Sequence, residues 1–145
     1  MEILTEEKAA SMLSEGFHCA QCVLGYGAEI LQLNKDFLMR LGSGLGGGCH
    51  YGGTCGAVSG AVICLGLRYG FGQDFDTERD TMLMRKLDLF QEKFLQQQVS
   101  LTCRELLCGY DITSADDRQK IEELHLSNVC AKACACACQI LKEML

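Results

Sequence analysis

Apolar residues recur at helical intervals along most of the chain, and no segment stands out as a strand. The longest such pattern follows residue 76, where the apolar positions are Leu83, Leu87, Phe90 and Phe94. The opposite side of this segment is charged and rich in glutamine, as the solvent face of a surface helix is. The pattern therefore predicts a long helix whose apolar stripe lies in the core.

Capping residues predict where the helices begin and end. Polar side chains suited to a helix N-terminus mark where the helical segments begin: Thr5, Asp76 with Thr77, Thr102, Ser114, and Ser127 or Asn128. Gly16 and Gly109 are placed to end two of these helices. Because the chain also lacks proline, we expect an all-α bundle. A length of 145 residues suits one compact domain, which we expect to span residues 1–145.

A glycine-rich stretch at residues 42–60 is the most unusual feature of the sequence. Such a backbone can turn with positive φ and can bring main-chain N–H groups close to a ligand. The small and apolar residues that follow, from Gly56 to about Tyr69, predict a buried central helix whose first turn carries Cys55. A thiol at a helix N-terminus is expected to have a lowered pKa, and the same expectation holds for Cys103.

The glycine-rich stretch does not match a nucleotide-binding loop. No lysine follows its glycines, and the residues before it have a helical pattern where a strand would be required. The sequence therefore favours another ligand for this loop.

Composition and charge narrow the class of protein. Apolar residues make up 48% of the chain and the formal net charge is −6, which argues against nucleic acid as the main partner. The acidic start has neither the positive region nor the apolar core of a signal peptide. No apolar run approaches the length of a membrane-spanning helix. We expect a cytoplasmic protein with no membrane association.

Eleven cysteines are more than packing requires in a reducing compartment, so metal binding or thiol redox chemistry is the leading expectation. Cys19 and Cys22 form a C-x-x-C motif within a helical pattern, which places both sulfurs on one face. That spacing suits one metal or a reversible disulfide. A zinc ribbon would need a second C-x-x-C, which the chain lacks.

The last helical segment carries a stripe of small residues and thiols. One face holds Cys130, Cys134, Cys138, Leu141 and Leu145, whereas Cys136 points elsewhere. Cys130 and Cys134 could form one edge of a metal site. The alternative is that Cys134 and Cys138 act as small core residues.

Four separated motifs carry a family resemblance. They are Cys19-Ala20-Gln21, the stretch Cys55-Gly56-Ala57-Val58-Ser59-Gly60, Cys103-Arg104-Glu105-Leu106-Leu107 and Cys130. In this order they resemble the C_GCAxxG_C_C family of putative redox-active proteins, which is related to the non-haem domain of split-Soret cytochromes. The haem part of those cytochromes is not expected here, since the chain has no C-x-x-C-H.

The resemblance implies a small helical protein in which Cys19, Cys55, Cys103 and Cys130 hold an iron–sulfur cluster. It also implies a homodimer, because the related cytochromes are dimeric. Thiolates suit such clusters, and amides of a glycine-rich loop, at Gly53 and Gly56, could hydrogen-bond to the sulfurs. Three of the remaining thiols are further candidate ligands, Cys22, Cys49 and Cys134, and so is the imidazole of His50.

The expected function is electron transfer or redox sensing, with a redox partner protein. A thiol–disulfide oxidoreductase using Cys19 with Cys22, or Cys55 with Cys103, is the second interpretation, although the βαβ context of a thioredoxin-like motif is missing. A structural or transport site for zinc or copper is the third. The sequence shows no paired carboxylates or Ser-His-Asp set that would indicate a substrate-converting enzyme.

Overall fold

Helices make up the regular structure of residues 2–145, the part of the chain that the computed structural model describes. In chain order they are α1 (Glu6–Ser14), α2 (Cys19–Leu31), α3 (Lys35–Leu41), a π-type turn (Gly48–Gly52), α4 (Gly56–Tyr69), α5 (Thr77–Gln97), α6 (Cys103–Leu106), α7 (Ala115–Glu123) and α8 (Ser127–Met144). Over these residues the only β pairing is an isolated bridge between Thr54 and Thr102. The predicted all-α fold is confirmed.

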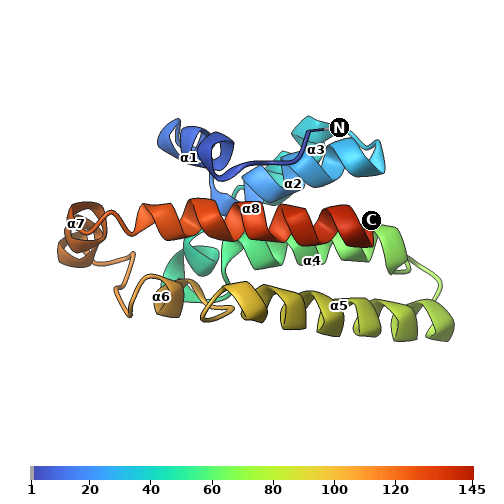
Figure 1. The fold of residues 1–145 in the computed structure, drawn as a ribbon. Helices are drawn as coiled ribbons and strands as arrows, with labels where there is room; N and C mark the ends of the chain where they lie inside the picture. Colours follow the sequence, from blue (N-terminus) through green and yellow to red (C-terminus); the bar gives the residue numbers. More distant parts are fainter. Residues whose placement is uncertain (1) are drawn as a thin grey trace.

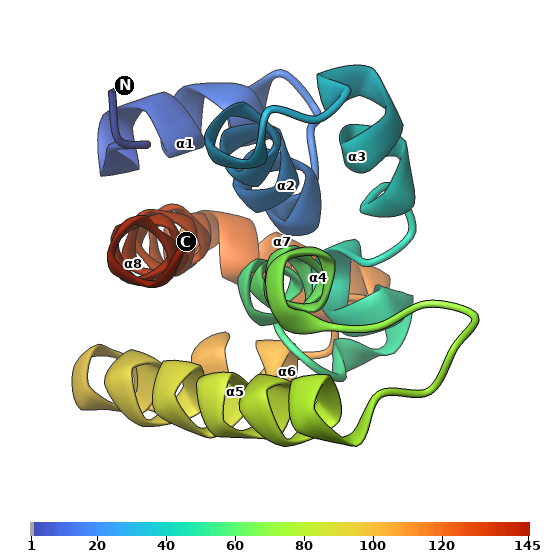
Figure 2. The ribbon, with the colours of Figure 1, turned by 90° about the vertical axis from the view of Figure 1, so that its right-hand side faces the viewer.

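The helices lie in three layers (Figures 1 and 2). Helices α4 and α8 form the middle layer, with α1, α2 and α3 on one side and α5 and α6 on the other. Helix α2 packs against both α4 and α8, and α5 packs against the same two helices from the opposite side. Helix α7 stands apart at the end of the molecule where α8 begins (Figure 1).

Most of the predicted helix starts are confirmed. The side chains of Thr5, Thr102 and Ser114 each accept a hydrogen bond from the backbone N–H three residues later. Asp76 and Thr77 open α5 as expected: the carboxylate of Asp76 accepts from the Arg79 N–H, and Thr77 is the first helical residue. Asp and Thr have similar capping chemistry, so the sequence alone did not separate these neighbours.

The core is built from both aromatic and thiol side chains. Phe90 and Phe94 of α5 are fully buried and stack at 5.8 Å between ring centroids, as the apolar stripe predicted. Four thiols, here called the core cysteines, are 0–1% exposed inside α2, α4 and α8: Cys22, Cys64, Cys134 and Cys138. The interpretation of Cys134 and Cys138 as small core residues agrees with this burial.

Two glycines allow α4 to approach α2 closely. A Cβ at Gly60 would lie 3.0 Å from the Ala20 carbonyl oxygen, and one at Gly56 would lie 3.0 Å from the Ala20 nitrogen and the Cys19 Cβ. Any larger residue would push the helices apart. The contact holds the start of α4, with Cys55, beside the start of α2, with Cys19.

Among the described residues, no single helix is long and apolar enough to cross a membrane. Only α7 and α8 taken together reach that length and composition, and they are bent by 77°. Nine residues of α8 are buried within the bundle, among them Cys134, Ile140 and Leu141.

Candidate functional site

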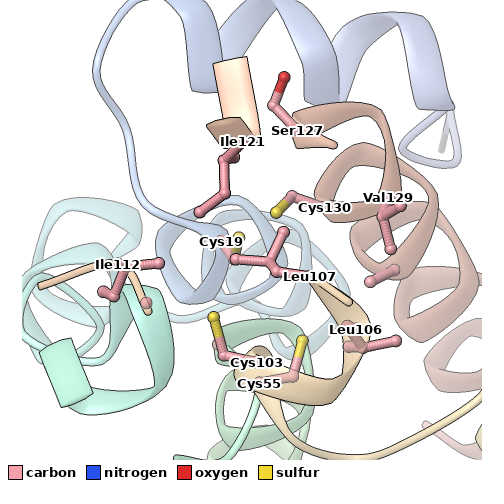
Figure 3. A pocket seen from close by; sticks show the side chains of 13 residues that line it. Cys19, Cys55, Cys103, Leu106, Leu107, Ile112, Ile121, Ser127, Val129 and Cys130 are labelled. Carbon is pink, nitrogen blue, oxygen red and sulfur yellow. The ribbon is translucent and has the colours of Figure 1, made fainter. Parts of the chain in front are cut away.

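Four cysteines from four helices line one cavity, here called the thiol cavity. They are Cys19, Cys55, Cys103 and Cys130, and the cavity has a volume of ≈ 190 Å³. In Figure 3 the sulfurs of Cys55 and Cys103 point from one side toward Cys19 and Cys130 on the other. The four cavity cysteines are those that the family motifs single out.

Helix starts bring these thiols together. Cys19 is the first residue of α2, Cys55 directly precedes α4, and Cys130 lies in the first turn of α8. Helix N-termini carry partial positive charge and unpaired N–H groups. The cavity is therefore placed where the backbone favours a negatively charged group.

A short backbone pairing holds Cys55 beside Cys103. The Cys55 N–H donates to the Leu101 carbonyl at 2.8 Å, and the Cys103 N–H donates to the Gly53 carbonyl at 2.7 Å. The bridge between Thr54 and Thr102 lies between these bonds. Gly53 thus positions Cys103 through its carbonyl and lies outside the cavity lining, whereas Gly56 forms part of that lining.

Apart from Ser127, the rest of the wall is apolar. It includes Leu106, Leu107, Ile112, Ile121 and Val129. Of the described residues that line the cavity, none carries a charged side chain. An apolar wall limits water access and so influences the redox potential of any bound group.

Hydrogen bonds between thiols make Cys19 the most acidic of the group. The pKa of Cys19 is held well below its usual range, mainly by hydrogen bonds from the thiols of Cys130 and Cys134. The pKa of Cys130 is raised, chiefly by the same hydrogen bond to Cys19, and the pKa of Cys134 is raised for that reason too. The Cys134 Sγ also lies 3.6 Å from the Cys19 carbonyl oxygen. Of the four cavity cysteines, Cys19 is therefore the one whose pKa is shifted toward the thiolate.

The expectation of lowered pKa values for Cys55 and Cys103 was wrong. Burial raises the pKa of Cys55 to about 12, despite hydrogen bonds from the Ala57 and Val58 amides that act in the opposite direction. Burial likewise raises the pKa of Cys103 to about 11. Desolvation of the charged form exceeds the contribution of the helix terminus at both positions.

The further candidate ligands lie outside the lining of the thiol cavity. Cys22 and Cys134 are buried in the core, and the Cys134 thiol hydrogen-bonds to Cys22, which lowers the pKa of Cys22. Cys49 and His50 are exposed in the glycine-rich loop, with φ of 57° and 65°. Of the eight candidate ligands, the structure therefore gathers four around one space.

The cavity cysteines do not converge on a single point. Over residues 2–145, no group of three or more His, Cys, Asp or Glu side chains has the arrangement of a single-ion site. The four thiols line one shared space.

Sequence reasoning did not identify Ile112 and Ile121 as parts of the site. Both lie in a polar segment whose helix, α7, contains no buried residue, so no apolar periodicity marked them. Leu106 and Leu107 had a clearer signal, since they follow Cys103 in the same motif.

Comparison with known families agrees with this geometry. A family model described as putative redox-active protein (C_GCAxxG_C_C) matches residues 17–144. The chain belongs to this family. The resemblance seen in the sequence motifs is thereby confirmed, and the family member is a cysteine-rich, redox-active type of protein. No curated protein and no solved structure matches it.

Proposed function

We propose that this family member binds an iron–sulfur cluster in the thiol cavity and acts in electron transfer or redox sensing. One observation carries the proposal: the motif cysteines, spread from residue 19 to residue 130, line a single apolar cavity. Four thiolates are the usual ligand set of such clusters.

Thiolates also suit zinc and copper, so the ligand set by itself does not name the metal. The choice of an iron–sulfur cluster rests on the redox-active description of the family together with the four motif thiols around one cavity.

The residues of the chain have distinct tasks in this proposal. The four thiols ligate, and three of them must release protons on binding because only Cys19 has a lowered pKa. The N-termini of α2 and α4 favour the negative charge that the thiolates bring. The apolar wall excludes water. The cluster, when bound, would supply one-electron chemistry, with a partner protein as donor or acceptor.

The test is to purify the protein without oxygen and to measure its visible spectrum, iron and acid-labile sulfide. We expect a coloured protein with iron and sulfide in similar amounts. Cys55→Ser should remove or alter the chromophore, because it replaces a ligand. The matched control is Cys136→Ser: Cys136 is buried to a similar extent, 6% exposed against 5% for Cys55, but lies outside the cavity lining.

A colourless and iron-free protein would overturn the proposal. So would equal loss of iron in the Cys55→Ser and Cys136→Ser variants, because the loss would then reflect a general disturbance of the core.

A thiol–disulfide function is the second candidate, and the hydrogen bond between Cys19 and Cys130 favours it. A thiolate beside a neutral thiol is suited to disulfide exchange. Oxidation of the Cys19 thiolate and the Cys130 thiol to one disulfide would pass two electrons and one proton to a disulfide acceptor, which becomes one thiol and one thiolate. The pairs expected from the sequence were Cys19 with Cys22 and Cys55 with Cys103. The structure favours Cys130 as the partner of Cys19.

Peptide mapping after treatment with oxidised glutathione tests this second candidate. A Cys19–Cys130 disulfide in an iron-free protein would support it. Mixed disulfides confined to the exposed Cys49 and Cys108 would contradict it.

A further inference from the structure

Residues 111–125, here called the lid segment, cover one side of the thiol cavity. Ile112, in the loop before α7, and Ile121, within α7, both line the cavity. In Figure 3 Ile121 lies on the side of Cys19 and Cys130, opposite Cys55 and Cys103, and Ile112 lies at the left of the cavity. The Ile112 side chain packs directly on Gly47 of the glycine-rich loop. The lid segment therefore closes the space between that loop and α8.

The lid segment is joined to the rest of the molecule weakly. None of its residues is buried, and α7 has no extensive packing with another helix of the described chain. Its side-chain hydrogen bonds are internal: the Asp111 N–H donates to Asp117 Oδ2 at 2.7 Å, and Arg118 donates to the Ile112 carbonyl at 2.9 Å. A longer ion pair, 3.5 Å between Arg104 and Asp111, connects it to α6.

Both ends of the lid segment have backbone suited to a hinge. Cys108 and Gly109 precede it with φ of 59° and 88°, and His125 ends it with φ of 54°. Helices α7 and α8 meet there at 77°. A segment with internal hydrogen bonds, little buried surface and turns at both ends can open as a unit at low cost.

The other walls of the cavity belong to tightly packed elements. Cys55 and Cys103 are 5% and 7% exposed, and Ala133 of α8 is fully buried. Cys19 and Cys130 are half-buried, so Cys55 and Cys103 are the shielded thiols of the cavity. The lid segment is the wall with the fewest contacts.

We propose that residues 111–125 form a hinged lid, and that its opening gives reagents and ligands access to the two buried thiols of the cavity, Cys55 and Cys103. The lid covers the cavity in which we propose that the cluster binds. This inference rests on the proposed function only for the identity of the ligand that enters. Apolar contacts of Ile112 and Ile121 hold it closed.

The experiment measures thiol modification in the reduced, iron-free full-length protein. N-Ethylmaleimide is added, and the labelling rate of each cysteine is followed by peptide mass spectrometry. The double variant Ile112→Ala with Ile121→Ala should label Cys55 and Cys103 about tenfold faster than the unaltered chain, because it removes apolar area that holds the lid closed. Leu124→Ala is the matched control, since Leu124 is 55% exposed and does not line the cavity.

Two core cysteines separate lid opening from general unfolding. Cys64 and Cys138 are fully buried away from the cavity, so their labelling rates report on the core. If the lid segment opens while the core stays folded, the labelling rates of Cys64 and Cys138 stay unchanged in the double variant. Unchanged labelling of Cys55 and Cys103, or an equal rise at Cys64 and Cys138, would overturn it. Because no iron is present, this result is independent of whether a cluster binds.

Discussion

The cavity cysteines and the core cysteines differ in what their thiols face. Cys19 and Cys22 lie one turn apart on α2, and Cys130 and Cys134 lie one turn apart on α8. In each pair the first thiol lines the cavity and the second is packed in the core. Burial follows the same division: the core cysteines are 0–1% exposed, whereas Cys55 and Cys103 are 5% and 7% exposed and Cys19 and Cys130 are half-buried. The difference is whether open space or packed side chains lie beside the sulfur.

This contrast follows from how the helices meet. Near the cavity α2, α4 and α8 come together at their first turns, whereas further along α4 and α8 pack side by side between α2 and the face of α5 that carries Phe90 and Phe94. Helix ends leave room and unpaired N–H groups, and helix flanks interdigitate. The first region can hold a ligand. The second provides the stability that keeps the first in shape.

The largest effect is expected from truncating the core beside the core cysteines. Phe94→Ala should lower the free energy of unfolding by about 3–5 kcal/mol, because Phe94 is fully buried between α5 and its neighbours. Urea denaturation followed by circular dichroism measures this change. Phe71→Ala is the comparison, since Phe71 is 39% exposed and should matter much less. An equal decrease in the free energy of unfolding in both variants would show that the buried core contributes no more to stability than the exposed Phe71.

A smaller effect is expected where the two regions join. Gly60→Ala should destabilise the protein by about 1–3 kcal/mol, because the added Cβ would meet α2 at 3.0 Å. It should also lower iron content, since the same contact keeps Cys55 near Cys19.

Gly66→Ala on the same helix provides the control for this change. A Cβ at Gly66 meets nothing within 4 Å, so alanine should stabilise the helix by about 0.5–1 kcal/mol. Similar unfolding curves for the two variants would mean that the contact between α2 and α4 tolerates expansion.

Replacing one core cysteine and one cavity cysteine of α8 tests the comparison directly. Cys138→Ala should cost about 1 kcal/mol of unfolding free energy, because it leaves a small void in the core, and should leave iron binding unchanged. Cys130→Ala should remove iron binding, with a change in stability of the iron-free protein below about 0.5 kcal/mol. Denaturation and iron analysis on both variants give the answer. Loss of iron binding in Cys138→Ala together with retained iron binding in Cys130→Ala would show that the two sets of cysteines have the opposite roles.

The smallest effect is expected at the exposed loop. Cys49→Ser should change the free energy of unfolding by less than about 0.5 kcal/mol and leave the visible spectrum as it is, because Cys49 is exposed and does not line the cavity. A spectral change in this variant would show that Cys49 contributes a ligand, as the surplus of thiols had suggested.

Local features of the chain made the fold largely predictable. The buried helix expected from Gly56 to about Tyr69 is α4, and the caps at Thr5, Thr102 and Ser114 lie as expected. Capping and periodicity act over a few residues, so the sequence contains them in full.

Longer-range effects were not predictable in this way. The pKa values of Cys55 and Cys103 were expected to be low, since only the helix start was visible, yet burial by other segments raises both. The cover that Ile112 and Ile121 give the cavity also comes from segments distant in the sequence.

By itself the sequence determined the helices, the motif cysteines and the family, because these depend on local spacing and on residue identity. Only the tertiary structure decided which of the eleven thiols share a cavity and which fill the core. Two thiols one turn apart on the same helix can lie in the cavity and in the core, because different helices pack against them. The physical reason is that desolvation, thiol hydrogen bonds and open space arise only where distant segments meet.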